Sequence, residues 1–280
     1  MTSVFIHWNP SPDLLTIPGI HWPLRWYGLC WAAGFLICSY IMGIIFKAEH
    51  RPTKQLDRLT MYIIFGTVIG ARLGHCFFYG PFFDVYDADG FLIEEGYLSH
   101  PLNILKVYEG GLASHGGAIG IITAMLLYGR KFKESYLWLF DRMVIVVPVA
   151  GALIRLGNLM NSEIIGNITT LPWGFIFERI DPAHPRHPSQ LYEALYCVIL
   201  FIVFFILWLK YRQQLKQGFM FGLFCVLLFM QRFLTEFLKE NQVSFEDQLP
   251  LNMGQILSLP FIGIGLWMML RKPKSAPVKY

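Results

Sequence analysis

Charged residues are scarce in this chain. Asp, Glu, Lys and Arg make up 15% of its 280 residues, whereas about a quarter of the residues in a typical soluble domain are charged. So small a charged fraction argues against a soluble globular protein.

Cysteine is also sparse, and the sequence contains no CxxC pair. All five cysteines fall within apolar segments, where they are spaced as packing residues: Cys30, Cys38, Cys76, Cys197 and Cys225. We therefore expect free thiols, with neither a disulfide bond nor a zinc site.

Two further segments bear on metal binding, and both are weak candidates. "DVYDADGFLIEEG" has the acidic character of a calcium loop, but alignment on Gly90 puts Val85 at its first position and Gly96 at its twelfth, where acidic ligands are required. "HPRH" at 184–187 offers two histidines with few other ligands nearby. We therefore expect no metal at either segment.

The motifs of several enzyme classes are missing. The chain has no P-loop, no HExxH and no Ser-His-Asp order. It also has no internal repeat and no low-complexity linker, so we predict a single domain over residues 1–280. Secondary transporters are commonly built from internal repeats. The lack of a repeat therefore argues against one possible function, that of a transporter for an anionic solute.

Apolar residues dominate instead: 55% of the chain is hydrophobic, including 24 Phe and 8 Trp. A helix needs about 20 apolar residues to cross a bilayer core, and seven runs approach that length. We predict an all-α, polytopic membrane protein with seven transmembrane helices at 24–46, 59–79, 112–129, 137–160, 189–209, 218–238 and 254–271.

Basic residues lie asymmetrically in the predicted loops. The segments after spans one, three, five and seven hold fourteen Lys and Arg residues, and the other loops hold four. The positive-inside rule then places the N-terminus outside, the C-terminus in the cytoplasm, and segments 80–111 and 161–188 outside. This bias explains the net charge of +4 without a nucleic-acid partner. The N-terminus lacks the basic region of a cleavable signal, so we expect span one to be a retained anchor.

Polar residues gather at the predicted outer ends of several spans. "RLGNLMNSEIIG" at 155–166 places Arg155 and Asn158 on one face of span four, with no acid on that face to neutralise the arginine. An arginine at the bilayer centre costs roughly 3 kcal/mol or more, and such residues normally face a shared cavity. At the same level we place Tyr27, Arg72, His115, His187, Gln190, Tyr192, Glu193, Arg232, Glu236 and Gln255.

Some of these polar residues also have purely structural interpretations. Arg232 and Glu236 are spaced as an i, i+4 ion pair within one helix. Tyr27 suits an interfacial aromatic belt. Arg72 suits snorkelling towards water or pairing with an acid of the loop.

The same holds for two other motifs. Gly116 and Gly117 suit close packing of span three against a neighbour. His187 and Glu193 suit the capping and orientation of span five, which Pro188 begins. The gathering of so many polar groups at one level nevertheless argues that they share a functional cavity.

The chemistry of such a cavity follows from its arginines. A guanidinium holds two oxygens of a phosphate at once, so Arg155 and Arg232 suit the phosphate of a lipid head group. A histidine such as His115 has a pKa near neutrality and is suited to removing a proton from a nucleophile. The residues alone predict a phospholipid-handling membrane protein whose site faces outward.

Seven motifs, in order along the chain, resemble those of the bacterial prolipoprotein diacylglyceryl transferase family: "RWYGL", "GARLGHCFFY", "EGGLASHGGAIG", "RLGNLMNSEIIG", "RHPSQLYE", "RFLTEF" and "MGQILSLP". The fourth matches the family's signature, whose residues are all present as Arg155, Gly157, Asn158, Asn161, Glu163 and Gly166.

The resemblance implies a reaction. Phosphatidylglycerol enters from the surrounding membrane lipid, its diacylglyceryl group passes to the sulfur of the lipobox cysteine in a prolipoprotein signal peptide, and glycerol phosphate leaves. The site would be on the outer side of the bacterial cytoplasmic (inner) membrane, with no metal or cofactor. A transferase for lipid groups with a different acceptor is the alternative within the same class.

Together with the gathered polar residues, the resemblance implies roles for individual side chains. The implied catalytic residues are His115, Arg155, Arg232 and Tyr27, with His115 the first candidate for the base and Tyr27 the second. The implied substrate-binding residues are Arg155, Asn158, Asn161, Glu163, Gly166, Gly116, Gly117, Glu236, His187, Gln190, Glu193 and Gln255.

Three features depart from the family's pattern. Ser162 stands where many members have glycine, and Lys239 stands where an arginine often follows the Arg232–Glu236 pair. The loop that precedes "RHPSQLYE" is short compared with some members. The first two bear on the positioning of the substrate, and the third bears on access for the protein substrate.

Overall fold

The computed structural model describes residues 5–17, 22–107, 111–238 and 251–272. The chain divides into two compact units. The first comprises Met1–Ile45 and Phe140–Tyr280, and the second comprises Phe46–Leu139. The boundaries between them fall inside two helices, near the C-terminal end of α1 (Trp26–Ala48) and the N-terminal end of α4 (Tyr136–Asn161).

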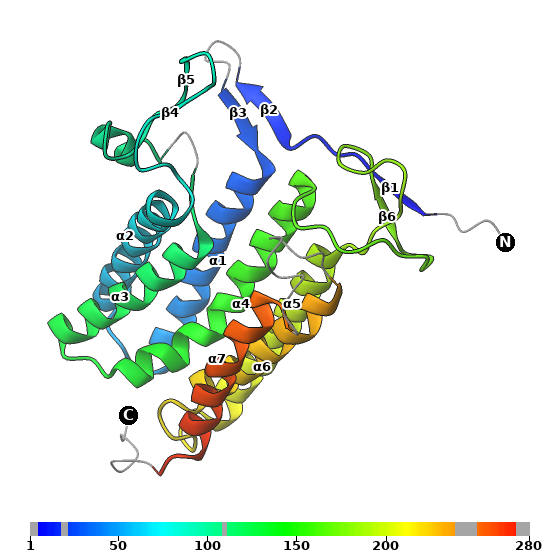
Figure 1. Cartoon of the computed structure of the whole chain (residues 1–280). Helices are drawn as coiled ribbons and strands as arrows, with labels where there is room; N and C mark the ends of the chain where they lie inside the picture. Colours follow the sequence, from blue (N-terminus) through cyan, green and yellow to red (C-terminus); the bar gives the residue numbers. More distant parts are fainter. Residues whose placement is uncertain (1–4, 18–21, 108–110, 239–250, 273–280) are drawn as a thin grey trace. The chain divides into compact units, whose positions relative to one another are not determined.

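The first unit also contains α5 (Ser189–Tyr211), α6 (Phe219–Thr235), a 3-10 turn at Glu236–Leu238, and α7 (Met253–Leu270) (Figure 1). Glycines allow close approach between neighbours: Gly34 of α1 lies against Ala150 of α4, and Gly151 of α4 lies against Cys197 of α5. Tyr196 Oη of α5 donates to the carbonyl of Leu227 in α6, at 2.8 Å. These contacts link α1, α4, α5 and α6 in that order.

Side chains fix where two helices of the first unit begin. The buried Asp141 carboxylate of α4 accepts hydrogen bonds from the backbone N–H groups of Gly218 (2.6 Å) and Phe221 (2.9 Å), so it caps α6 from a neighbouring helix. Asn252 and Gln255 form a capping box at the start of α7. Both devices satisfy N–H groups that a helix terminus leaves without a partner.

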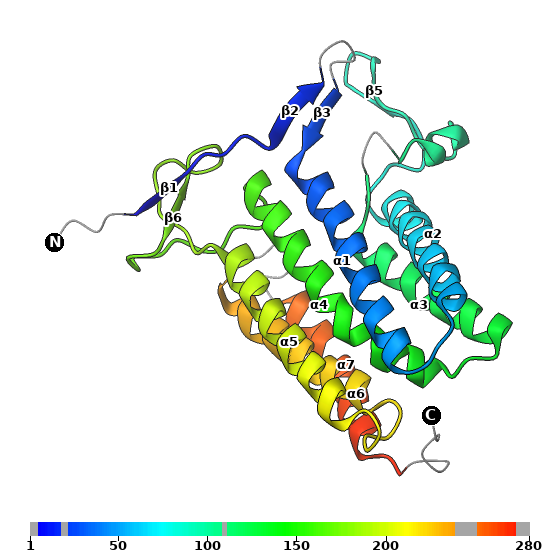
Figure 2. The ribbon, with the colours of Figure 1, turned by 180° about the vertical axis from the view of Figure 1, so that it is seen from behind.

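In the part of the chain that the structure describes, three short two-stranded sheets accompany the helices (Figure 2). In the first unit β1 (Ile6–Trp8) pairs in parallel with β6 (Phe175–Phe177), and β2 (Asp13–Ile17) pairs antiparallel with β3 (Trp22–Arg25). In the second unit β4 (Val85–Tyr86) pairs antiparallel with β5 (Leu92–Glu94). The sequence analysis predicted none of these strands.

The second unit is built on α2 (Thr53–Phe78) and α3 (Ser114–Phe132), with a 3-10 helix at Pro101–Leu105. The two long helices meet through glycines. A Cβ added to Gly70 would lie 2.4 Å from the carbonyl oxygen of Gly116, and one added to Gly120 would lie 2.0 Å from that of Gly66. Neither position has room for a side chain, so the backbones of α2 and α3 are in direct contact, as in small-residue packing of membrane helices.

The prediction of a mainly helical membrane protein is confirmed. Each of the seven predicted spans corresponds to one of α1 to α7 within the described residues, although α2 begins six residues before the predicted 59 because its first turns are polar. Within the described ranges, five helices are long and apolar enough to cross a membrane: α1, α2, α4, α5 and α7. At 17 residues α6 is shorter, and α3 carries four glycines. The count of seven spans and the orientation of the termini remain predictions.

Candidate active site

The signature stretch lies where α4 ends and the chain reverses direction. Ser162 and Ile164 both have left-handed backbone conformations, with φ of 57° and 58°, which are unfavourable for residues other than glycine. The N–H of Ser162 donates to the carbonyl of Leu159 at 3.1 Å, and that of Glu163 donates to the carbonyl of Asn158 at 2.9 Å. These bonds close the end of α4 and turn the signature side chains back towards the helix.

The Glu163 carboxylate gathers the two signature asparagines. Its Oε2 accepts from Nδ2 of Asn158 at 3.0 Å, and its Oε1 accepts from Nδ2 of Asn161 at 3.1 Å. Asn158 is buried, and the Oδ1 atom of Asn161 is buried with no hydrogen-bond partner within the described residues. The structure therefore brings these three predicted site residues together and leaves an acceptor available beside them.

Arg155 is paired, contrary to the expectation of an arginine with no neutralising acid. Its Nε lies 2.5 Å from Oε2 of Glu193 on α5, and the side chains are 24% and 9% exposed. The partner lies on the next helix, so the spacing of residues along α4 could not reveal it. Neither terminal nitrogen of Arg155 makes a hydrogen bond to any described residue, so the outer edge of the guanidinium remains available to a ligand.

The start of α5 holds the turn in place. Ser189 Oγ donates to the carbonyl of Ile164 at 2.6 Å, and Nε2 of the fully buried Gln190 donates to the carbonyl of Glu163. Among described residues, Oε1 of Gln190 has no hydrogen-bond partner. Pro188 is the N-cap residue of α5, and no side chain makes a cap hydrogen bond there. Side-chain capping by His187 or Glu193 is therefore not observed among the described residues, whereas the orienting part of the interpretation fits the contacts of Glu193 with Arg155 and of His187 with Tyr192.

His187 joins the turn through its backbone. Its carbonyl accepts from the N–H of the buried Gly166 at 2.9 Å, and its N–H donates to the carbonyl of Asn167 at 3.0 Å. Its Nδ1 lies 3.2 Å from Oη of Tyr192, which also accepts from Nε1 of Trp173 at 3.0 Å. The structure thus ties Gly166 and His187 to the same turn as Glu163.

Tyr27 packs on the signature helix. It lies in the first turn of α1, and a Cβ added to Gly157 would lie 2.8 Å from its Cδ2 and 3.2 Å from its Cα. Gly157 is therefore required for this approach. Because Gly157 lies about 160° around the helix from Arg155, Tyr27 packs on a different face of α4 from the arginine.

Arg232 and Glu236 form the predicted pair within one helix, but the contact is long. Arg232 Nη2 lies 3.6 Å from Glu236 Oε1, and the arginine side chain is 40% exposed. Glu236 Oε2 also accepts from Nδ2 of Asn252 at 3.4 Å, and the buried Gln255 donates through Nε2 to the carbonyl of Phe233 at 3.3 Å. The ends of α6 and α7 are therefore joined around the Glu236 carboxylate.

The segment 161–188 folds onto the end of α4. Nε1 of Trp8 in β1 donates to the carbonyl of Leu159 at 2.9 Å, and Leu159, Phe175 and Phe177 form a buried cluster against which Trp8 packs. Nη2 of Arg179 donates to the carbonyl of Met160 at 2.8 Å and to Oγ of Ser162 at 3.0 Å. The β1–β6 sheet thus supports the signature turn.

Asp181 in this segment contacts two basic side chains. Nε of Arg186 donates to Asp181 Oδ2 at 2.8 Å, and Nδ1 of His184 lies 3.0 Å from Asp181 Oδ1. The hydrogen bond from Arg186, followed by that with His184, lowers the pKa of Asp181 to about 2. Arg186 also donates to the carbonyl of Gly166 at 3.3 Å, so it links this pair to the signature turn.

In the second unit, His115 is the second residue of α3, and its side chain is exposed with no hydrogen-bond partner within the described residues. It lies in the first turn of the helix, because α3 begins at Ser114 and the predicted span began at residue 112. The packing interpretation of Gly116 is confirmed, since an added Cβ would lie 2.2 Å from the carbonyl oxygen of Gly70. Gly117 has more space, with its nearest neighbour 3.6 Å away.

Arg72 is buried, so its interpretation as a snorkelling residue is wrong. It donates to the carbonyls of Ile104 (3.0 Å), Asn103 (2.5 Å) and Gly111 (3.3 Å), and its Cζ lies 5.3 Å from the ring centroid of Tyr97. These contacts fasten the segment that leads to His115 onto α2.

Among the described residues, no three His, Cys, Asp or Glu side chains gather as a metal site. The sequence analysis also missed several supporting residues: Trp8, Ser189 and Asn252. Of these, only Asn252 had a local signal, because "NMGQ" has the spacing of a capping box. Lys239, one of the departures from the family, lies outside the described residues.

Comparison with known proteins decides the family. Residues 12–271 match the family described as prolipoprotein diacylglyceryl transferase. The chain belongs to the prolipoprotein diacylglyceryl transferase family. It is 43% identical over 274 residues to the phosphatidylglycerol–prolipoprotein diacylglyceryl transferase of Bacteroides fragilis, covering 98% of each chain. It is 44% identical over 271 residues to the protein of that name from Tolumonas auensis, covering 96% of this chain and 98% of the relative.

The departure from the family's pattern at Ser162 has an explanation in the backbone. Ser162 has φ of 57°, a conformation that glycine adopts without cost, which accounts for the glycine that many members have there. In this chain the serine adopts the left-handed conformation, and its hydroxyl accepts a hydrogen bond from Arg179.

Proposed function

We propose that this protein transfers the diacylglyceryl group of phosphatidylglycerol to the thiol of the lipobox cysteine of prolipoproteins. The thiolate sulfur attacks the glyceryl carbon that bears the phosphate ester, the carbon–oxygen bond breaks, and glycerol phosphate leaves with the electron pair. The relatives that match almost the full length of the chain carry the name of this activity. The structural observation that carries the proposal is the Arg155 guanidinium, held by Glu193 at Nε with both terminal nitrogens available.

The phosphate is the natural ligand of those nitrogens. A guanidinium donates two parallel hydrogen bonds to two phosphate oxygens, and charge builds up on the phosphate as the ester bond breaks. Donors fixed before the reaction stabilise this charge without reorganisation. Arg232 is half exposed and only loosely paired, so we assign it the second contact to the leaving phosphate.

The nucleophile must lose a proton, because a thiol has a pKa of about 8.5 and is mostly protonated at neutral pH. His115 is exposed, with no hydrogen-bond partner within the described residues. We assign it the role of general base, with Tyr27 as the second candidate.

The remaining signature residues would orient the head group. Asn161 Oδ1 and Gln190 Oε1 are buried acceptors without partners in the described chain, and they suit the hydroxyl groups of the glycerol head. Asn158, Glu163, Glu193 and Glu236 hold the arginines and amides in place. We also retain Gly116, Gly117, Gly166, His187 and Gln255 as residues that shape the substrate site.

The membrane arrangement is part of the proposal. Seven helices cross the bacterial cytoplasmic membrane, with the N-terminus outside, and residues 1–280 form one integral-membrane domain that the family match spans from 12 to 271. The signature turn and segments 80–111 and 161–188 then face outward, where the lipobox of an exported prolipoprotein is presented. No metal or cofactor is required.

The experiment that tests this function follows the label in radioactive phosphatidylglycerol. The purified protein should transfer label from the diacylglyceryl part to a lipobox peptide and should transfer none to a peptide with serine in place of the cysteine. A transferase with another acceptor would leave the cysteine peptide unlabelled and would label a different component of a membrane extract.

A further inference from the structure

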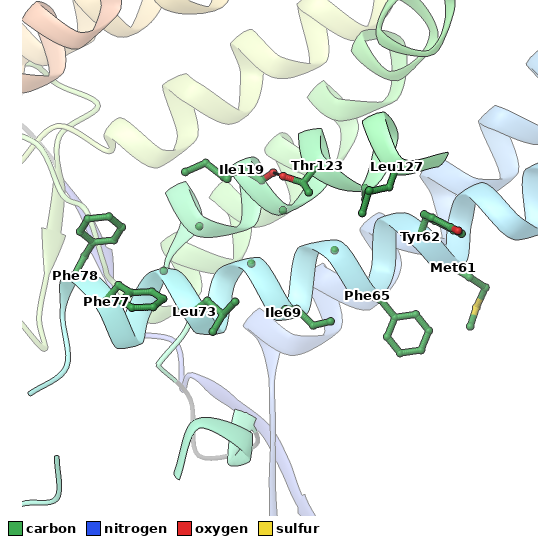
Figure 3. A pocket seen from close by; sticks show the side chains of 16 residues that line it. Met61, Tyr62, Phe65, Ile69, Leu73, Phe77, Phe78, Ile119, Thr123 and Leu127 are labelled. Atoms are coloured by element: carbon green, nitrogen blue, oxygen red, sulfur yellow. Dashed lines mark hydrogen bonds between the residues drawn. The ribbon is translucent and has the colours of Figure 1, made fainter. Parts of the chain in front are cut away.

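A long apolar groove follows the seam between α2 and α3. It has a volume of about 680 Å³, and the glycines that bring the two helices into contact form its floor. Its walls are side chains that stand on either side of the seam: Phe65, Ile69, Leu73 and Phe77 of α2, and Ile119, Thr123 and Leu127 of α3 (Figure 3). These side chains are exposed, so the groove is open along its length.

Positive charge stands at one end of this groove. Tyr62, which lines that end, packs edge-on against Phe132 with ring centroids 6.2 Å apart. Arg58 Cζ lies 5.2 Å and Lys131 Nζ lies 5.9 Å from the centroid of the same Phe132 ring. The aromatic pair thus connects the apolar groove directly to two cations.

These two cations are not neutralised by the parts of the protein that the structure describes. No carboxylate among the described residues lies within 4.0 Å of the side-chain nitrogens of Arg58 or Lys131, although nearby Arg51 is paired with Glu134 at 2.7 Å. The two positive charges repel each other, and an anion bound near both would offset this repulsion. The arrangement therefore suits a phosphate at the end of an apolar groove.

The shape of the groove selects a slender occupant. An α-helix with its side chains is at least about 10 Å wide, so it would have to rest on the exposed side chains that border the groove, such as Phe65 and Phe77. The glycines at the seam are already in contact with each other, so they cannot receive the backbone of a third helix as small-residue motifs do. A single acyl chain meets neither difficulty.

We propose that the α2–α3 groove binds one anionic phospholipid, with its phosphate at Arg58 and Lys131 and one acyl chain along the glycine seam. The phosphate end of this site is distant from the proposed base, because Lys131 lies 16 residues beyond His115 on α3, which corresponds to about 24 Å. The opposite end of the groove reaches Gly116, beside His115. In the proposed orientation the lipid belongs to the cytoplasmic leaflet. It would complete the packing of α2 against α3 and would not be a donor in the reaction.

Photolabelling tests the site without relying on transfer activity. The probe is phosphatidic acid with a photoreactive group in one acyl chain, which has the required phosphate but lacks the glycerol head of the proposed donor. In detergent micelles it should label peptides of α2 and α3, and unlabelled phosphatidic acid should compete better than phosphatidylcholine with the same chains. In the double variant Arg58→Gln and Lys131→Gln, unlabelled phosphatidic acid should compete roughly thirtyfold less well, because the attraction of two basic residues for an anionic lipid is lost.

Two further variants separate the groove from general charge effects. Thr123→Trp should block labelling of α2 and α3 by filling the groove, and Lys210→Gln with Arg212→Gln, which removes the same charge from the end of α5, should leave it unchanged. Equal competition by phosphatidylcholine, full labelling of the Arg58/Lys131 variant, or full labelling of the Thr123→Trp variant would overturn the proposal. So would disulfide-linked dimers of a Thr123→Cys protein, which would show that a second copy covers the groove.

Discussion

Arg155 on α4 and Glu193 on α5 form an ion pair in which Nε lies 2.5 Å from Oε2. The ion-pair contact is made at Nε, and neither terminal nitrogen makes a hydrogen bond to a described residue. The glutamate therefore fixes the orientation of the arginine without occupying the nitrogens that would grip a phosphate.

Arg155→Lys separates a phosphate anchor from an ion pair with a structural role. Lysine keeps the charge beside Glu193, so the protein should remain stable, but it lacks the fork that holds two oxygens. We expect turnover to fall about a hundredfold, as when a donor to a developing charge is removed, with a smaller change in lipid affinity. Arg155→Ala should instead lower stability by about 3–5 kcal/mol, because a largely buried carboxylate loses its partner.

Arg179→Lys is the matched control for Arg155→Lys. Arg179 donates through a single nitrogen to Met160 and Ser162, which an ammonium group can also do, so activity should be retained. A stable Arg155→Lys protein with near-normal turnover would remove the anchor role from Arg155, and Arg232 would then be the next candidate.

His115→Gln should lower turnover a hundredfold or more, the range of general-base catalysis, while lipid binding and thermal stability stay unchanged because the side chain is exposed. Partial recovery of activity at higher pH would indicate that the supply of thiolate was lost. His7→Gln serves as the control, since His7 is also exposed and belongs to the first unit. Wild-type turnover in the His115 variant would show that another group takes the proton.

The backbone at Ser162 yields a stability prediction. Ser162→Gly and Ser162→Ala both remove the hydroxyl that accepts from Arg179, but only glycine relieves the left-handed conformation at φ 57°. The glycine variant should therefore be more stable than the alanine variant by about 1 kcal/mol. Thermal unfolding in detergent measures the difference, and an alanine variant of equal or greater stability would show that the turn is not strained.

The ion pair at Asp181 predicts a pH dependence. Its pKa of about 2 lies below the usual value near 3.9, so the pair stabilises the folded state above pH 4, and this contribution is lost as the pH falls through 2. Wild type should melt at a higher temperature than Asp181→Asn above pH 4, and the two curves should converge towards pH 2. A difference that persists unchanged to pH 2 would show that the charge on the Asp181 carboxylate is not the source of this stability.

Orientation can be tested with an impermeant thiol reagent applied to intact cells. Cysteines placed at Glu94 and Asp247 should react from outside, and those placed at Lys54 and Lys131 should not; Asp247 lies outside the described residues. The native cysteines are buried or half-buried, so they should resist the reagent. Labelling at position 54 would reverse the proposed topology.

Sequence patterns were sufficient for the helices because long apolar runs carry a strong and local signal. They were insufficient for the strands: β1 is three residues long and pairs Ile6 with Phe175, a contact without any local pattern. The same limit applied to the site. The signature residues could be named from their motif, but the Arg155–Glu193 pair joins two helices, and spacing rules reveal only partners on the same helix.

The central claim is that phosphatidylglycerol is cleaved at the site that contains Arg155 and that its diacylglyceryl group is transferred to a thiol. The most direct measurement quantifies both products of one reaction, the lipobox peptide with diacylglyceryl on its cysteine and the released glycerol phosphate, by mass spectrometry. We predict equal amounts of the two with wild-type protein, and a parallel loss of both with stable Arg155→Lys. Glycerol phosphate without modified peptide, or equal product from the variant, would contradict the account.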